Sequence, residues 1–290
     1  GFDVVEWLVI DDGSSDRTAE VAAEPGVDHV VRLTENRGLA HALMTGLDAA
    51  LRAGADVVVN TDADNQYDGS CIPDLVLPIV EGRADLVVGE RPIESVDDFS
   101  PLKKRLQRLG SSVVRAFSGT TVRDAASGFR AFDRRAAVRT QVFGKYSYTM
   151  ETLVQAGWEG MRVVGVPVRV NPATRPSRLV KSIPRYVWRS GTAIVRAFAL
   201  YKPFRFFFGV GLVPFLLGLV LVGRWFYLRT FTDDVASRVP SVVAAAVLML
   251  LAAQFWILGL LADLLSANRR LLSEVRVMSR RADLERPDPT

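Results

Sequence analysis

The chain has 290 residues, a formal net charge of +4 and 49% apolar residues, which allows one domain of ordinary size plus a membrane part. Cys71 is the only cysteine, so an internal disulfide and a thiolate metal cluster are both excluded. Residues 160–232 contain no Asp or Glu, whereas Arg and Lys recur throughout them. Such a stretch is typical of a surface that meets anionic lipid headgroups or phosphates, and the apolar segments beside it argue against nucleic acid as a partner.

The first half of the chain predicts strands alternating with helices. Short apolar runs predict strands at residues 7–10, 27–33, 55–60 and 85–89, and the valine-rich third run is of the kind buried on both faces of a sheet. Helical spacing predicts a helix over residues 38–53, a second over 73–81, and a short one that ends near residue 23 and is capped by Ser15 or Asp16. This alternation indicates an α/β layered domain, in which ligands bind beyond the carboxyl ends of the strands.

The next part of the chain is read in the same way. We expect a basic helix at residues 102–117, a loop and strand at 124–132, a helix at 148–156 and a strand at 162–170. A helix that begins near Pro184 would carry basic side chains on one side and apolar ones on the other. That pattern indicates a helix lying in the membrane interface, although an ordinary surface helix packed on the domain is the alternative.

Two later segments, residues 206–223 and 241–262, carry no charge. A helix needs about 20 such residues to cross a bilayer core, so both are expected to span the membrane. A pair of buried core helices is the alternative. The flanks before the first span and after the second are rich in Arg and Lys, which places both flanks and the large domain in the cytoplasm.

Two acidic motifs follow predicted strands. Asp62, Asp64 and Gln66 lie in a tight loop where their oxygens can approach a divalent ion and the diphosphate that it carries; a solvated acidic turn is the alternative. Asp11 and Asp12 can accept hydrogen bonds from a ribose or a nucleobase, or serve only to cap a helix.

Four segments, taken in order, resemble the motifs of family 2 glycosyltransferases: residues 9–16 (VIDDGSSD), 36–38 (NRG), 62–66 (DADNQ) and 124–130 (DAASGFR). Within that family the chain is similar to polyprenyl-phosphate sugar synthases of the dolichyl-phosphate mannose synthase type. The resemblance covers most of residues 4–182. It implies a GT-A (Rossmann-like) α/β domain, a nucleotide-diphosphate sugar donor, and inverting transfer of one sugar to a polyprenyl phosphate at the cytoplasmic face of the cell membrane.

The resemblance also assigns residues. Asp62, Asp64 and Gln66 would hold Mg²⁺ or Mn²⁺. The implied donor-binding residues are Asp11, Asp12, Arg37, Asp62 and Arg91. The implied catalytic residues are Asp64, Asp124 and Arg130, and those near the acceptor phosphate are Arg108, Arg130, Arg175, Ser177 and Lys181. Glu151 sits where related enzymes that act on hydroxyl acceptors keep a base, and a structural salt bridge is the alternative.

These expectations divide the chain into four parts. Residues 1–174 form the cytoplasmic catalytic domain and 175–203 the basic interfacial helices. Residues 204–265 hold two transmembrane helices, at about 206–228 and 240–263, and 266–290 form a cytoplasmic basic tail. The resemblance leaves room for a homo-oligomer assembled through the spans.

One departure from the family concerns the beginning of the chain. Family members usually start with a strand that ends in a Pro-x-x-Asn-Glu-like turn, whereas this chain opens just before what would be the second strand. A central strand and part of the nucleotide pocket are therefore expected to be absent. Two other functions stay open: a non-catalytic membrane-anchored subunit that binds nucleotide sugars, and a polysaccharide synthase of the same family.

Overall fold

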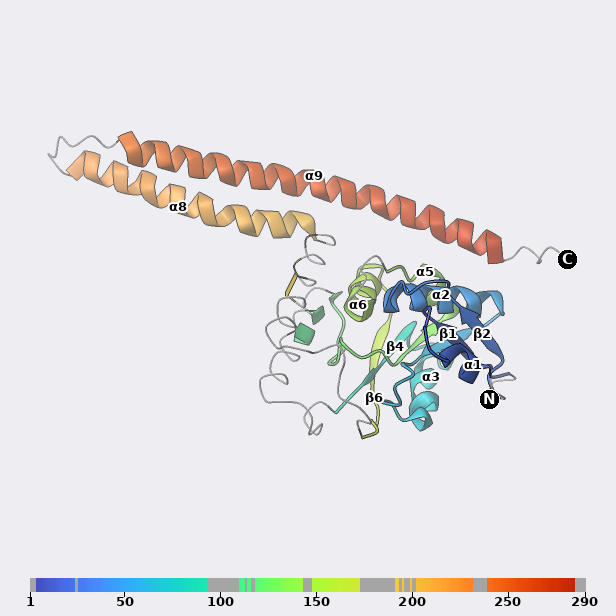
Figure 1. Ribbon diagram of the computed structural model, residues 1–290. Helices are drawn as coiled ribbons and strands as arrows, with labels where there is room; N and C mark the ends of the chain where they lie inside the picture. Colours follow the sequence, from blue (N-terminus) through green and yellow to red (C-terminus); the bar gives the residue numbers. More distant parts are fainter. Residues whose placement is uncertain are drawn as a thin grey trace. The chain divides into compact units, whose positions relative to one another are not determined.

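The computed structural model describes residues 4–23, 26–92, 110–112, 114–115, 118–142, 148–172, 191–192, 195, 199, 202–231 and 239–284. The chain divides into two compact units. The first comprises Gly1–Ile194 together with Arg276–Thr290, and the second comprises Val195–Val275. The first unit carries the α/β architecture and the second the long apolar helices (Figure 1).

The strands of the first unit form two sheets. In one, β1 (Leu8–Asp11) pairs in parallel with β2 (His29–Arg32). The other has the order β3-β5-β4-β6. Its strand β5 runs antiparallel to both neighbours, and β4 and β6 are parallel. The bounds of these four strands are Val57–Asn60 for β3, Leu86–Glu90 for β4, Arg130–Asp133 for β5 and Val163–Pro167 for β6.

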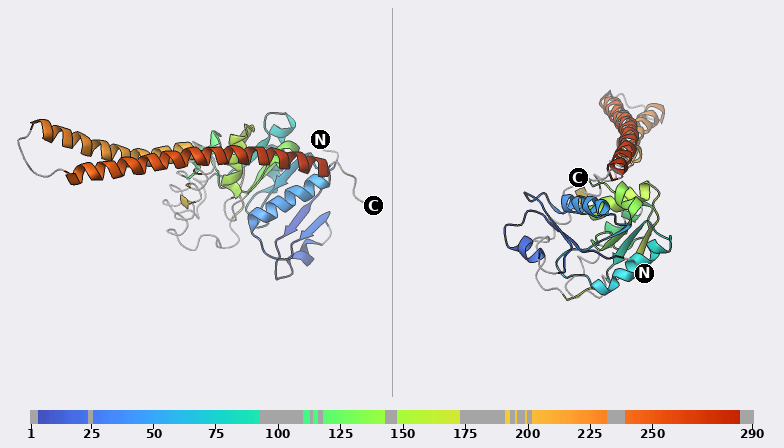
Figure 2. Two further views of the ribbon diagram at one scale, coloured as in Figure 1. Left: turned by 90° about the horizontal axis from the view of Figure 1, so that it is seen from above. Right: turned by 90° about the vertical axis from the view of Figure 1, so that its right-hand side faces the viewer.

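Helices cover both faces of the strands. Figures 1 and 2 show α2 (Leu39–Arg52), α5 (Arg134–Arg139) and α6 (Tyr148–Trp158) on one side and α3 (Ile72–Val80) on the other. The sequence did not predict α5. Its six residues are too few for a helical period to emerge, and it is started by Asp133, whose carboxylate accepts the backbone N–H of Ala136.

Two shorter helical segments complete this unit. The helix expected to end near residue 23 is only α1 (Thr18–Ala22), and Asp16 accepts the N–H of Thr18 at its start. A 3₁₀ turn, Gly69–Cys71, leads into α3. On α2, Leu43, Leu47 and Leu51 are buried, while Leu39 in the first turn is 53% exposed.

The two sheets differ in how deeply their strands are buried. The first four residues of β4 are buried, because the strand is paired on both edges. All four residues of β3 are only half-buried, contrary to the expectation of burial on both faces. Within the described residues β3 pairs with β5 alone, and no described strand joins β3 to β1. The absence of a central strand stays a prediction.

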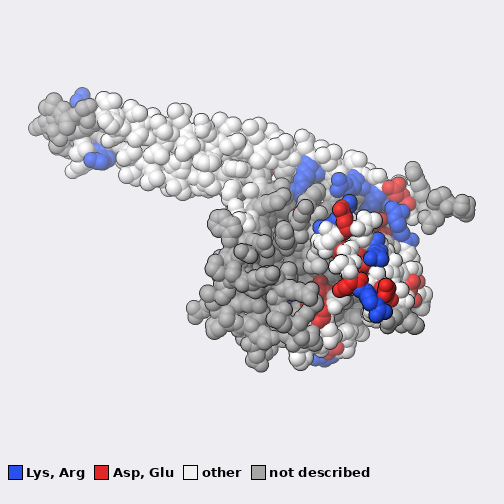
Figure 3. Space-filling view, in the orientation of Figure 1, with Lys and Arg blue, Asp and Glu red and all other residues white. Residues whose placement is uncertain are grey.

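The second unit contains two helices that are long and apolar enough to cross a membrane, α8 (Pro203–Phe231) and α9 (Val239–Leu284). The latter continues past Val275 into the first unit. Both include the predicted spans and extend beyond them. Most of the expected interfacial region, residues 175–203, lies outside the described residues. Figure 3 shows the middle of the two helices without charged side chains on the visible face.

Small residues let the two helices approach closely. Gly211 and Gly218 of α8 are buried, as are Ala245 and Ala252 of α9. The ring of Trp256 fills the space beside Gly211, stacks on Phe208 with ring centroids 5.5 Å apart, and donates a hydrogen bond to the Phe208 carbonyl at 3.3 Å. Backbone approach at small residues is how apolar helices associate in lipid, so the pair forms the expected hairpin.

Candidate active site

The register of the second sheet brings several predicted residues to one edge. Arg130, the first residue of β5, lies opposite Asn60 at the end of β3 and opposite Val88 near the end of β4. The segments that follow β3 and β4 and the segment that precedes β5 therefore meet there. They carry Asp62, Asp64, Arg91 and Asp124. Asp62, Asp64 and Arg91 thus follow the carboxyl ends of β3 and β4, where the α/β pattern places ligands, and Asp124 joins them because β5 runs antiparallel.

The loop after β3 has a fixed conformation. The carboxylate of Asp64 accepts the backbone N–H of Gln66 at 3.0 Å, and Asn65 between them has a left-handed φ of 57°. Asn171 closes the loop from the far side by donating its amide to the Asn65 carbonyl at 3.1 Å, while its own N–H reaches the Gln66 carbonyl at 2.9 Å. These contacts hold the Asp64 carboxylate and the backbone of the loop in place.

The surroundings of Asp62 disfavour its negative charge. Burial raises the pKa of Asp62 above its ordinary value, and the neighbouring Asp64 raises it further. Arg91 and Arg130 oppose the shift but do not reverse it. A half-buried carboxylate whose negative charge is incompletely balanced favours a bound cation.

This donor set fits a divalent ion that completes its coordination with phosphate and water. Mg²⁺ is usually held by one or two carboxylates plus substrate phosphates. Among the described residues no group of three or more His, Cys, Asp and Glu side chains could enclose a metal. Asp62 and Asp64, with Gln66 on the same loop, therefore offer a partial ligand set whose remaining positions are open to a substrate.

Arg91 and Asp124 form a buried ion pair beside this loop. Arg91 donates from Nε to one carboxylate oxygen at 2.6 Å and from a terminal nitrogen to the other at 3.1 Å. The side chains are only 10% and 1% exposed. Burial alone would lower the pKa of Arg91, but the hydrogen bonds and charge of Asp124 raise it above the ordinary value. Arg91 thus stays a fixed positive charge next to Asp62.

Arg130 is fully buried and points into the domain. It donates to the backbone carbonyls of Ser127 at 2.9 Å, Ala125 at 3.1 Å and Thr149 at 2.6 Å, and to the hydroxyl of Thr152. Burial lowers its pKa to about 10, so it remains charged at neutral pH. In this arrangement Arg130 ties the 124–129 loop to α6, and its assigned role near an acceptor phosphate stays a prediction.

A layer of polar side chains that the sequence did not single out supports Asp62. A Cβ atom at Gly128 would lie 2.7 Å from a carboxylate oxygen of Asp62 and 2.8 Å from the hydroxyl of Tyr148. The Gly128 carbonyl accepts from Asn60 at 2.9 Å, and its N–H donates to the Tyr67 hydroxyl at 3.1 Å. Gly128 belongs to the segment 124–130 that resembles a family motif. Nothing in the sequence around Tyr67 or Tyr148 indicated that they would lie near Asp62.

The second group of predicted residues surrounds Asp11. This residue is 2% exposed. One carboxylate oxygen accepts the N–H of Ser14 at 2.9 Å. The other is buried without a hydrogen bond among the described residues, and Arg32 Nε lies 3.5 Å from it. Hydrogen bonds from Ser14 lower the pKa of Asp11, so it is ionised at neutral pH. An unsatisfied buried carboxylate oxygen is costly and indicates a place for a ligand donor.

The Asp12 carboxylate binds backbone N–H groups in this structure. Its two oxygens accept the N–H groups of Arg37 at 3.0 Å and Gly38 at 2.8 Å, which fixes the start of α2. The Arg37 side chain is exposed and donates to Glu35 at 3.1 Å. Asp12 and Arg37 therefore shape the loop beside Asp11.

Most of the remaining predicted residues belong to the acceptor side of the site. Arg108, Arg175, Ser177 and Lys181 lie outside the described residues, so their acceptor-side assignment stays a prediction. Glu151 is buried in α6 with 9% of its surface exposed.

Comparison with known proteins agrees with this geometry. Residues 2–139 match the family model described as glycosyl transferase family 2. An undecaprenyl-phosphate mannosyltransferase from Micrococcus luteus is 30% identical over 172 residues, covering 56% of this chain and 70% of the relative. A UDP-N-acetylglucosamine–dolichyl-phosphate N-acetylglucosaminyltransferase from Methanococcus voltae is 29% identical over 184 residues, covering 56% and 73%.

Solved structures support the fold. The mannosyl-3-phosphoglycerate synthase from Rubrobacter xylanophilus superimposes with a TM-score of 0.50 at 21% identity, over 68% of this chain and 63% of that structure. This likeness concerns the GT-A fold alone. Together with the ordered motifs and the site at the strand ends, the sequence matches show that the chain belongs to glycosyltransferase family 2.

Proposed function

We propose that the protein transfers a single sugar, with inversion, from a nucleotide-diphosphate sugar to a polyprenyl phosphate at the cytoplasmic face of the cell membrane. The observation that carries the proposal is the presence, in one chain, of the anchored Asp62–Asp64 loop and of two helices able to cross a bilayer. Transfer from a water-soluble donor to a lipid acceptor requires a donor site and an attachment to the membrane in the same protein. The two named relatives carry polyprenyl-phosphate acceptors in their names, which supports the same acceptor class here.

The donor would lie across the two groups of site residues. The buried oxygen of Asp11 that lacks a hydrogen bond would accept one from the base or ribose of the nucleotide. Asp62, Asp64 and Gln66 would hold Mg²⁺ or Mn²⁺, which neutralises charge on the departing diphosphate. Arg91, held by Asp124, would add a fixed positive charge beside the same phosphates.

A phosphate acceptor removes the need for a general base. A phosphate monoester is already an anion at neutral pH, so the attacking oxygen carries no proton that must first be removed. What the site must supply is positive charge, because donor and acceptor repel each other. Arg108, Arg175, Ser177 and Lys181 are proposed to supply it from the acceptor side. A single displacement at the anomeric carbon then inverts its configuration.

The proposal is tested with membranes that contain the full-length protein and a panel of nucleotide sugars labelled in the sugar. We expect label from one donor to enter the organic-extractable lipid, to disappear on chelation and to return with Mg²⁺ or Mn²⁺. Asp64→Asn is the matched control for folding and membrane insertion. Donor binding without labelled lipid would instead identify a non-catalytic binding subunit, and labelled polymer a polysaccharide synthase.

A further inference from the structure

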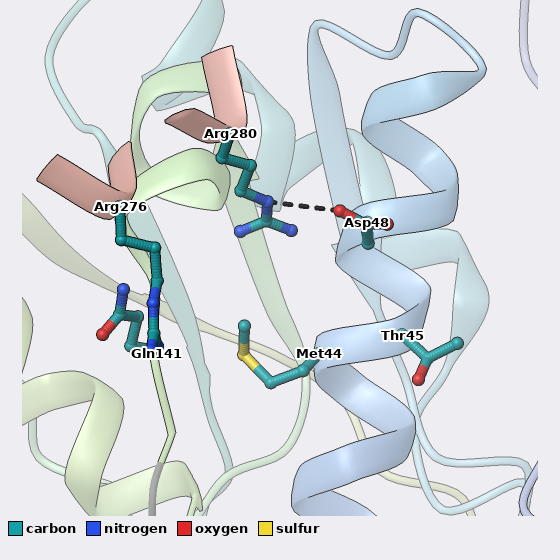
Figure 4. A pocket seen from close by; sticks show the side chains of 6 residues that line it. All are labelled: Met44, Thr45, Asp48, Gln141, Arg276 and Arg280. Atoms are coloured by element: carbon teal, nitrogen blue, oxygen red, sulfur yellow. Dashed lines mark hydrogen bonds and ion pairs between the residues drawn. The ribbon is translucent and has the colours of Figure 1, made fainter. Parts of the chain in front are cut away.

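The last turns of α9 form a cavity with α2 and the segment after α5, away from the candidate active site. The cavity measures ≈ 340 Å³ and is lined by Met44, Thr45, Asp48, Gln141, Arg276 and Arg280. Residues from Arg276 onward belong to the first unit, as do the other lining residues. Figure 4 shows Arg276 and Arg280 reaching from α9 toward side chains of α2 and Gln141. None of these six residues is needed for the proposed transfer.

Arg280 builds one wall of the cavity and is fully engaged. Its Nε lies 3.3 Å from a carboxylate oxygen of Asp48, as Figure 4 shows. A terminal nitrogen donates to the carbonyls of Ala137 at 3.3 Å and Val138 at 3.2 Å, near the carboxyl end of α5. A cation at that end satisfies carbonyls that have no partner within the helix and matches the helix dipole. Arg280 therefore fastens the end of α9 to α2 and α5.

Asp48, the one acidic side chain among the described lining residues, is already neutralised. Besides Arg280, it accepts from Arg52 at 3.0 Å. Arg276, by contrast, is exposed and makes no ion pair with a described residue. Because the guanidinium group stays charged at any physiological pH, the cavity holds one positive charge that the surrounding described residues do not balance.

Gln141 adds a second polar side chain to the lining of the cavity. The residue is 8% exposed, and its backbone N–H is held by the side chain of Gln155 at 2.9 Å. Its own side-chain amide lines the cavity yet makes no hydrogen bond to a described residue. The amide lines the open cavity together with Arg276, so both side chains can donate hydrogen bonds to an acceptor bound there.

We propose that this cavity binds a phosphate group, either as a free ion or as the headgroup of an anionic lipid. Arg276 offers planar paired donors, Gln141 an amide donor and Thr45 a hydroxyl, which together suit the several oxygens of a phosphate. Met44 supplies a flexible apolar flank that can rest against an attached carbon chain. Bound phosphate would bridge α9 to the segment after α5 and so strengthen the attachment that Arg280 begins.

The test uses the full chain and two probes. In detergent, inorganic phosphate is titrated against chloride at equal ionic strength while thermal unfolding is followed. In nanodiscs, phosphatidylglycerol replaces phosphatidylcholine and the same midpoint is measured. We expect a saturable rise in the midpoint in at least one arm; a rise in both identifies the phosphate ion as sufficient, and a rise only in nanodiscs identifies a lipid headgroup.

Variants distinguish binding in this cavity from nonspecific attraction of anions to the basic side chains of α9. Arg276→Ala is expected to weaken the apparent affinity at least about tenfold, as is Gln141→Leu, since each removes a hydrogen bond to a charged group. Arg281→Ala removes the same charge from an exposed neighbour on the same helix that does not line the cavity, and should leave the affinity unchanged. The proposal is overturned if neither probe saturates, or if Arg276→Ala and Arg281→Ala weaken binding equally.

Discussion

Arg91 and Asp124 are joined by two hydrogen bonds of 2.6 and 3.1 Å, although 33 positions separate them in the chain. The pair links the end of β4 to the loop before β5 and places a guanidinium group beside Asp62. It thus connects a residue assigned to the donor with one assigned to catalysis, and makes both depend on the same contact.

The first prediction concerns this pair. Asp124→Asn is expected to lower the free energy of unfolding by about 3–5 kcal/mol, because it removes the hydrogen-bonded counter-charge of the buried Arg91 guanidinium. Arg83→Gln breaks an exposed pair with Glu81, whose side chains are 57% and 44% exposed, and should cost no more than about 1 kcal/mol. Chemical unfolding in detergent measures both. Equal losses in the two variants would contradict a structural role for the Arg91–Asp124 pair.

The second prediction separates stability from activity at Asp62. Since burial and Asp64 raise the pKa of Asp62, its stabilising contribution is complete below the ordinary value of 3.8 and is lost as pH rises through the raised value. At neutral pH the charged form therefore destabilises the fold. Asp62→Asn is expected to raise the melting temperature at neutral pH while transfer falls by about 10²-fold.

Mg²⁺ provides the control for that result. A metal that binds the folded state raises its melting temperature. The rise should occur in the natural protein and be much smaller in Asp62→Asn. A lower melting temperature for Asp62→Asn in the absence of metal would show that the carboxylate is stabilised rather than strained.

The third prediction concerns Gly128. An added methyl group there would lie 2.7 Å from Asp62 and 2.8 Å from Tyr148, so Gly128→Ala must displace one of them. Displacing the carboxylate by about 1 Å is expected to reduce transfer by about 10²-fold. Gly69→Ala is the matched control, because no atom lies within 4 Å of its added methyl group. Steady-state transfer rates and melting temperatures of both variants make the comparison, and equal activity would rule out the proposed crowding.

The fourth prediction concerns pH. Hydrogen bonds from the side chains of Ser70 and Arg169 lower the pKa of Asp68 to about 2. Because the folded-state pKa is depressed, the stabilisation is present above the ordinary value of 3.8 and is lost as pH falls through about 2. The difference in melting temperature between the natural protein and Asp68→Asn should therefore shrink as the pH falls from 3.8 to about 2. Arg169→Gln should weaken the same dependence, and a difference that does not change with pH would refute the assignment.

Much of the fold follows from local pattern. Every predicted strand of the described chain is present, and both predicted spans lie within longer helices. These elements could be recognised because an apolar run or an uncharged segment is visible within a short stretch of sequence. The antiparallel direction of β5 was not foreseen, since no short-range signal sets which strands pair. The half-burial of β3 has the same origin: it depends on which edges are paired.

The residues of the site were predictable from the sequence, whereas their contacts within the protein were not. Asp62 and Asp64 lie at the strand end as expected. Arg130, which motif position assigned to a phosphate, donates to backbone carbonyls inside the domain. Asp12 likewise holds the start of α2. A motif fixes which side chain is present, whereas its partner is chosen by tertiary packing of distant segments such as α6.

The proposed attacking group is a lipid phosphate, which already carries a negative charge and which the protein positions beside the donor. The most direct measurement supplies the reconstituted full-length protein with its labelled donor and Mg²⁺ or Mn²⁺, and compares undecaprenyl phosphate with undecaprenol as acceptors. We expect labelled lipid from the phosphate and none from the alcohol. Equal labelling of the alcohol, or labelling of neither in the presence of bound donor, would contradict it.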